Sequence, residues 1–359
     1  MRSRIRTNLV APLSVLALLG AACSGSSSAE TSDGSNADCT PADSPIVTLT
    51  AYSNVYDTYG KLISIFQSDW KEQHDDQQVQ FSTSFGGSTT QAQNVVSGFP
   101  ADIAALSLTP DVDLIKDAGL ITHDYTRDAE GSFVASSSVV FDVRPGNPLN
   151  IQNWGDLTKP GVEILTPDPA SSGGARWNIV AAYGAAMRGE VPGYAADNPA
   201  DAERLLTDIF KNVTVMDKSA NDSIKNFQAG NGDVAITYEY AVLAAQAQGL
   251  EDEMVIPPST VAIQTPTVVI DRNAEAHCVQ DVAAAFVDFL HTDEAKQIFT
   301  DVGYERSTDL KAAQSGEDGT FEPVDDLFTT EDLGGWDELD NTVFGPDGAF
   351  TKALAAAQG

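Results

Sequence analysis

Two short runs of serine and glycine have the residue types needed to hold an anion. One is Ser171-Ser172-Gly173-Gly174 and the other is Gly86-Gly87-Ser88. Glycine leaves backbone N–H groups uncovered, and a serine at the start of a helix adds a hydroxyl donor. This composition favours anion binding by neutral donors. Such serines can also serve only as helix caps, which is their commoner use.

Each run lies between a predicted strand and a predicted helix. Residues 162–166 and 79–83 have the β-branched or alternating pattern of strands, and residues 177–187 and 90–96 have helical spacing. A third polar turn, residues 217–220, follows a predicted strand at 213–216 and ends at Ala220. Helix N-termini attract anions, so we expect the N-termini of the helices that follow these turns to converge on one ligand.

Strands alternate with helices along most of the chain from residue 46. This order predicts an α/β fold with mostly parallel sheets flanked by helices, in which ligands bind at the carboxyl ends of strands. With 359 residues, 42% of them hydrophobic, two lobes are expected. We assign residues 46–136 and 246–310 to lobe I, 137–245 to lobe II, and 311–359 to a C-terminal segment that packs on the lobes.

The first 45 residues predict export. Residues 1–22 combine three arginines with an apolar run, as in a signal peptide, and the stretch ending at Cys23 resembles a bacterial lipobox, although Gly20 stands where leucine is usual. We expect Cys23 to carry a lipid, the alternative being a plain secretory signal cut nearby. The polar residues that follow, up to residue 45, predict a flexible linker.

Two further cysteines, Cys39 and Cys278, remain after Cys23. Export permits a disulfide, and these two allow one internal pairing. Because Cys39 lies in the predicted linker, the sequence leaves both the paired and the unpaired state open.

The chain is strongly acidic, with a formal net charge of −32, or −35 once the signal peptide and its three arginines are removed. Such a surface repels nucleic acid and anionic lipid, so membrane association is expected only through the lipid anchor. The acidic side chains can also serve only as a solvated surface layer that keeps the protein soluble. An anion site must therefore be built from local dipoles.

The sequence does not indicate an enzyme. The four histidines, His74, His123, His277 and His291, are in no metal-ligand spacing, and motifs for a nucleophile elbow, a zinc protease or a nucleotide loop are absent. We expect no catalytic residues, no metal and no cofactor.

Several motifs in one order resemble the sulfate-binding proteins of bacterial ABC importers, over about residue 47 to the C-terminus. The motifs are Phe85-Gly86-Gly87-Ser88, Ala101-Asp102-Ile103, Val143-Arg144-Pro145-Gly146-Asn147-Pro148, Trp154-Gly155-Asp156-Leu157-Thr158-Lys159-Pro160-Gly161-Val162, Thr166-Pro167-Asp168-Pro169-Ala170-Ser171-Ser172-Gly173-Gly174-Ala175-Arg176-Trp177-Asn178 and Gly334-Gly335-Trp336. The resemblance implies a two-lobed type II periplasmic-binding-protein fold that closes on a dehydrated sulfate in the cleft between the lobes. It further implies a monomer outside the cytoplasmic membrane that delivers sulfate to permease subunits.

The resemblance also implies the ligand set. Ser88 would give its hydroxyl and N–H, Ser172 its hydroxyl, and Gly173, Gly174 and Ala220 their N–H groups. Two positions depart from the family. Ser53 replaces an aspartate that uses its N–H, and Tyr238 replaces a tryptophan whose indole N–H donates. A phenol can accept as well as donate, so Tyr238 can loosen selectivity; a packed core aromatic is the other interpretation.

Other interpretations remain at this point. Arg176 is expected to support its loop rather than pair with the ligand. The same scaffold could take thiosulfate or molybdate. More distant alternatives are a secreted lipoprotein hydrolase and a purely structural surface lipoprotein.

Overall fold

The computed structural model describes Cys39 and residues 43–126, 131–316 and 321–358. The predicted signal peptide, Cys23 and most of the predicted linker lie outside these residues. The chain divides into residues 1–39 and a compact unit of residues 40–359. Its strands are β1 (Ile46–Tyr52), β2 (Gln80–Gly86), β3 (Ile103–Ala105), β4 (Phe133–Val143), β5 (Ile164–Pro167), β6 (Val213–Asp217), β7 (Val234–Tyr238), β8 (Glu253–Val255), β9 (Ser259–Val269) and β10 (Asp326–Phe328).

The strands form one mixed sheet in the order β2-β1-β3-β9-β4-β7-β5-β6, with β10 beside β9 and β8 beside β4. Pairing is parallel within the group β1 to β3 and within the group β5 to β7, as the alternation of strands and helices predicts. Where β4 and β9 join these groups, the pairing is antiparallel. The predicted α/β fold class is confirmed.

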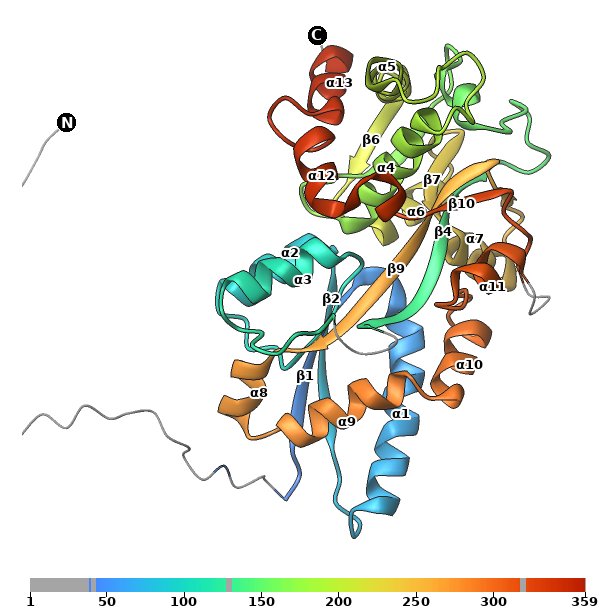
Figure 1. The fold of residues 1–359 in the computed structure, drawn as a ribbon. Coiled ribbons are helices and arrows are strands. Elements are labelled where there is room, and N and C mark those ends of the chain that lie inside the picture. The colour runs from blue at the N-terminus through green and yellow to red at the C-terminus, as the bar shows by residue number, and fades with distance from the viewer. Residues whose placement is uncertain (1–38, 40–42, 127–130, 317–320, 359) are drawn as a thin grey trace, which may run out of the picture. The chain divides into compact units, whose positions relative to one another are not determined.

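Two long strands, β4 and β9, link the groups and run side by side across the middle of the sheet (Figure 1). The first half of β4 pairs with β9 and its second half with β7, while the end of β9 pairs with β3. β9 contains a proline, Pro266, which has no backbone N–H to donate. Pro266 is tolerated opposite a bulge between Phe133 and Ala135. The lobe boundaries stay a prediction.

Helices cover the sheet and follow most of its parallel strands (Figure 1). They are η1 (Ser53–Val55), α1 (Tyr56–Gln73), α2 (Ser88–Val96), α3 (Thr109–Asp117), η2 (Trp154–Thr158), α4 (Gly173–Met187), α5 (Pro199–Phe210), α6 (Ala220–Gln228), α7 (Glu239–Ala247), α8 (Asp271–His277), α9 (Gln280–Leu290), α10 (Asp293–Asp301), α11 (Leu310–Ser315), η3 (Glu331–Leu333), α12 (Gly335–Thr342) and α13 (Ala349–Gln358).

Helix α4 is the central helix of the upper part of the molecule. It is buried on almost every side, as expected for a helix that is apolar all round. α5 packs on it and α13 packs on α5. Its Asn178 amide donates to Thr166 Oγ1 and to the Ile236 carbonyl, at 3.0 and 2.8 Å, which ties α4 to β5 and β7. The start of α4 is therefore fixed relative to the ends of two strands.

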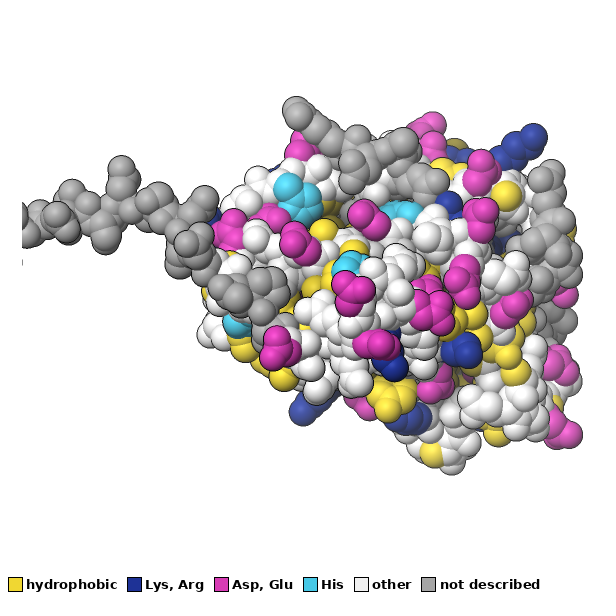
Figure 2. Space-filling model, turned by 90° about the horizontal axis from the view of Figure 1, so that it is seen from below, with side chains coloured by type: hydrophobic (Ala, Val, Ile, Leu, Met, Phe, Trp, Pro, Cys, Tyr) yellow, Lys and Arg dark blue, Asp and Glu magenta, His cyan; other side chains and the backbone are white. Residues whose placement is uncertain are grey.

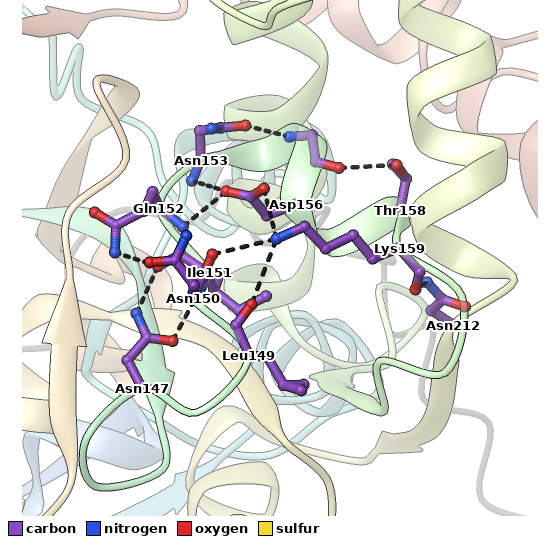
Figure 3. A network of polar contacts seen from close by, with 11 residues as sticks. Asn147, Leu149, Asn150, Ile151, Gln152, Asn153, Asp156, Thr158, Lys159 and Asn212 are labelled. Atoms are coloured by element: carbon purple, nitrogen blue, oxygen red, sulfur yellow. Dashed lines mark hydrogen bonds and ion pairs between the residues drawn. The ribbon is translucent and has the colours of Figure 1, made fainter.

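The loop between β4 and β5 is held by a polar network, shown in Figure 3. Asn153 caps η2, and Asp156 accepts from the backbone N–H groups of Gln152 and Asn153. Lys159 Nζ lies 2.9 Å from Asp156 Oδ1 and donates to two carbonyl oxygens of the loop. The Trp154-to-Val162 motif therefore has a structural role at this loop.

A buried ion pair anchors the junction of β7 and α7. Arg306 donates from Nε and Nη2 to the two carboxylate oxygens of Glu239, the second at 2.7 Å, and both side chains are almost fully buried. The backbone of Arg306 also pairs with Ser136 on β4. Because Glu239 directly follows Tyr238, this pair fixes the position of Tyr238.

Cys39 and Cys278 are both disulfide-bonded in the structure, while their pairing with one another stays a prediction. Among the described residues, no helix combines the length and apolar character needed to cross a membrane. Within the same residues, no group of three or more His, Cys, Asp or Glu side chains is arranged to hold a metal ion.

Replacing Glu239 by alanine should leave the buried Arg306 charge unpaired. We expect the free energy of unfolding, measured by urea denaturation, to fall by about 3–5 kcal/mol. The control is Asp208→Ala, which breaks the exposed pair of Asp208 with Lys211 and should cost about 0.5 kcal/mol or less. Equal losses in the two variants would contradict a structural role for the Glu239–Arg306 pair.

Candidate anion-binding site

A small cavity lies where the two groups of strands meet. Six of the seven predicted ligand residues line it, although they come from distant parts of the chain: Ser53, Ser88, Ser172, Gly174, Ala220 and Tyr238. The seventh, Gly173, does not line the cavity but begins α4 at its edge. The structure thus brings the predicted residues together, and their contact with a ligand stays a prediction.

Three α-helices begin at this cavity. Ser88 is the first residue of α2, Gly173 of α4 and Ala220 of α6. The first N–H groups of a helix have no partner within the helix. In the part of the chain that the structure describes, the backbone hydrogen bonds outside helices and strands do not use the N–H groups of Ser88, Gly173, Gly174 or Ala220. These four donors are available to an anion.

Ser172 does not act as a cap, although it stands at the N-cap position of α4. Its side chain makes no capping hydrogen bond. Ser219, at the equivalent position of α6, accepts from the backbone N–H of Asp222 and donates to its carboxylate. The capping interpretation of the serine-glycine run therefore fits Ser219 and not Ser172, whose hydroxyl remains available at the cavity.

Two serine hydroxyls are already used within the protein. Ser88 Oγ donates to Asp111 Oδ2 at 2.6 Å and accepts from the N–H of Ser107 at 3.0 Å. Ser53 Oγ donates to Asn54 Oδ1 at 2.7 Å. The prediction that Ser88 gives its hydroxyl to the ligand does not fit this arrangement, because that hydrogen points to Asp111. Ser88 and Ser53 have their N–H groups left for this role.

Asp111 lies behind the cavity wall rather than in the cavity, whose lining residues do not include it. Burial raises the pKa of Asp111 to about 6, against the lowering effects of hydrogen bonds from Ser88 and Thr89 and of the Arg176 charge. Arg176 itself pairs with Asp340 and stacks on Trp336 and Phe344. It does not line the cavity, so the structure agrees with a supporting role for Arg176.

Tyr238 ends β7 with its side chain buried against the cavity. Burial raises the pKa of Tyr238, so its phenol stays protonated and can donate. Within the described residues its hydroxyl has no hydrogen-bond partner. A phenol in a packed core normally finds one, and this favours the ligand role over the core interpretation.

The electrostatics of the cavity depend on dipoles. No Lys, Arg, His, Asp or Glu is among its lining residues in the described chain. The outer surface is different, since Figure 2 shows acidic side chains spread over the lower face with fewer basic ones among them. The groups that this cavity offers to an anion are therefore N–H and O–H donors, inside a protein of net charge −32.

A buried carboxyl, Glu305, lies close to the site. It accepts from the Tyr52 hydroxyl at 3.3 Å, and Tyr52 lines the cavity. Burial raises the pKa of Glu305 to about 8, against the smaller lowering effect of the Tyr52 hydrogen bond. Glu305 is therefore mostly neutral at pH 7.

The sequence analysis missed Ser107, Tyr52 and Asn54, which also line the cavity. Ser107 had a signal, because it directly follows the apolar run 101–106, just as the other predicted donors follow strands. Tyr52 and Asn54 flank Ser53 at the end of β1 and had no pattern of their own.

The two sides of the cavity touch at Gly87. The N–H of Thr90 donates to the Ser171 carbonyl at 3.3 Å, and a Cβ added at Gly87 would lie 2.3 Å from the same oxygen. Gly87 has an ordinary φ of −61°, so it is needed here for close approach and not for backbone freedom.

Gly87→Ala should hold the two sides apart. We expect the affinity for an oxyanion such as sulfate, measured by calorimetry, to fall about tenfold or more, since overpacking typically costs about 1–3 kcal/mol. Gly60→Ala is the control, because a Cβ there meets nothing within 4 Å. An unchanged affinity in Gly87→Ala would show that this contact does not matter for binding.

Glu305 should also make stability depend on pH. Its pKa is raised in the folded protein, so the folded state binds the proton more tightly, and stability should fall as pH rises from about 4.5 to about 8. Glu305→Gln cannot ionise, so its midpoint of thermal unfolding, measured without ligand, should drop less over this range than that of the natural protein. The control is Glu72→Gln at an exposed position, whose unfolding midpoint should change with pH as that of the natural protein does. If the midpoints of Glu305→Gln and of the natural protein change equally with pH, the prediction is wrong.

Comparison with known proteins agrees with this geometry. The family model described as bacterial extracellular solute-binding protein matches residues 47–305. The sulfate-binding protein of Synechococcus elongatus is 35% identical, over 100% of this chain and 98% of its own. That of Escherichia coli is 37% identical, over 83% of this chain and 88% of its own. The solved structure of the sulfate-binding protein SubI from Mycobacterium tuberculosis, 32% identical, superposes with a TM-score of 0.73 over 82% of this chain and 98% of that one. The chain belongs to the family of bacterial extracellular solute-binding proteins.

Proposed function

We propose that this protein captures sulfate outside the cytoplasmic membrane and delivers it to the permease of an ABC importer. One observation carries the proposal: the starts of α2, α4 and α6 meet at a small cavity lined by neutral groups. Each helix start carries roughly half a positive charge, so three of them offset much of a dianion. Its relatives from Synechococcus elongatus and Escherichia coli are sulfate-binding proteins, which supports the same ligand.

The donors favour sulfate over phosphate. Sulfate at neutral pH has no proton, whereas phosphate usually keeps one. In a cavity without a carboxylate acceptor, the phosphate hydroxyl would lose a hydrogen bond, at a cost of about 1–3 kcal/mol. Ser53, Ser88, Gly173, Gly174 and Ala220 are proposed to give N–H groups, and Ser172 and Tyr238 their hydroxyls.

We also infer that the protein is a carrier and not an enzyme. Ser172 and Tyr238 have no general base beside them among the cavity-lining residues. Ser88 contacts the carboxyl of Asp111, but none of the four histidines lines the cavity to complete a nucleophilic site. The hydrolase alternative gains no support.

We further propose that the protein acts as a monomer tethered to the outer face of the cytoplasmic membrane. The tether would be a lipid on Cys23 followed by the linker that ends at residue 45. Its basis is the sequence alone, because these residues lie outside the described chain.

Calorimetry with sulfate, thiosulfate, molybdate and phosphate tests the proposed ligand. Sulfate should bind most tightly and phosphate at least about tenfold more weakly, from the unmade hydrogen bond. Tighter binding of thiosulfate or molybdate would move the assignment to that anion, and no binding of any of the four would refute it.

Gly174→Asp should abolish sulfate binding. A Cβ at Gly174 would lie 3.4 Å from Ser172 Oγ and 3.4 Å from the Ala220 Cβ, so it fits while its carboxylate enters the cavity. We expect an affinity loss of more than about 100-fold from the like charge. Gly173 is less suitable, since a Cβ there would lie 2.2 Å from Ser107 Oγ. The control is Gly60→Asp, which places the same charge on an open helix face and should bind sulfate normally. Sulfate binding retained by Gly174→Asp would contradict the placement of the sulfate site at the start of α4.

A further inference from the structure

Ser107 has a hydroxyl that the ligand set above does not use. It follows β3, is 2% exposed and lines the cavity. Its Oγ has no hydrogen-bond partner among the described residues. Burying a hydroxyl without a partner is unfavourable, and such groups usually meet a partner or a ligand.

The backbone of Ser107 is fixed on both sides by elements of the site. Its N–H donates to Ser88 Oγ at 3.0 Å, and its carbonyl accepts from Trp177 Nε1 at 2.6 Å. Ser88 begins α2, and Trp177 belongs to the first turns of α4. Ser107 is therefore held in place by two of the helices that present free N–H groups.

The Ser107 hydroxyl lies over the first residue of α4. A Cβ built on Gly173 would be only 2.2 Å from Ser107 Oγ. At the next residue, a Cβ on Gly174 would be 3.6 Å from Tyr238 Cε1. Ser107 and Tyr238 thus flank the start of α4, with their buried hydroxyls close enough to interact, and neither hydroxyl meets a hydrogen-bond partner elsewhere among the described residues.

We propose that Ser107 is a further ligand residue, whose hydroxyl donates directly to the oxyanion held at the start of α4, next to the Tyr238 hydroxyl. The inference rests on the proposed function and extends it by one donor. It adds a neutral group to a site without charged side chains, so it suits a fully ionised tetrahedral oxyanion. A competing arrangement is that Ser107 bonds only to Tyr238 and supports it.

A double-mutant cycle separates these arrangements. Sulfate affinity is measured by calorimetry for the natural protein, Ser107→Ala, Tyr238→Phe and the double variant. Direct donation predicts that Ser107→Ala weakens binding about tenfold or more, as expected for a hydrogen bond to a charged group. A loss of sulfate affinity from Ser107→Ala should persist in the Tyr238→Phe background, although the two losses need not add, because the two hydroxyls are neighbours.

Ser137→Ala is the matched control, because Ser137 is also 2% exposed and its Oγ also lacks a partner, but it lies on β4 and does not line the cavity. It should bind sulfate normally, and thermal unfolding without sulfate checks that each variant is folded. If the natural protein binds sulfate and Ser107→Ala binds it equally well, the inference is wrong while the proposed function stands. A loss that disappears in the Tyr238→Phe background also overturns direct donation. Absence of sulfate binding by the natural protein would instead refute the proposed function.

Discussion

The structure depends on the unpaired N–H groups at helix starts. A helix must leave its first donors without internal partners, and here three α-helices leave them facing one cavity. A ligand that accepts several hydrogen bonds is a natural partner for such groups, and an anion also benefits from the aligned helix dipoles. The rest of the fold serves to keep these starts together.

Two kinds of interaction hold the N-termini of these helices in place relative to one another. The long strands β4 and β9 connect the two groups of strands, so the ends of β1 and β7 face each other across a short distance. Buried polar contacts then fix individual junctions. Asn178 ties α4 to β5 and β7, and the Glu239–Arg306 pair holds the end of β7. None of these contacts touches the cavity, yet each decides where a donor lies.

Much of this arrangement could be predicted from the sequence, because strand and helix patterns are local. The junctions at Ser88, Ser172 and Ala220 follow from runs of a few residues, and parallel strands place such junctions at one edge. The first residue of α4 was harder to predict, because Gly173 and Gly174 belong to the helix although glycine favours a turn. The partner of the Ser88 hydroxyl was out of reach, because Asp111 is 23 residues away in sequence and only the folded chain brings it near.

The acidic exterior has a consequence for how the ligand arrives. Repulsion between an approaching dianion and a surface of this charge acts over about 10 Å at 0.1 M salt and shortens as salt rises, whereas the hydrogen bonds of the enclosed cavity act only on contact. Dissolved ions therefore govern the rate of encounter more than the lifetime of the complex. Capture becomes faster in saltier surroundings, the reverse of proteins that draw in their ligands by opposite charge.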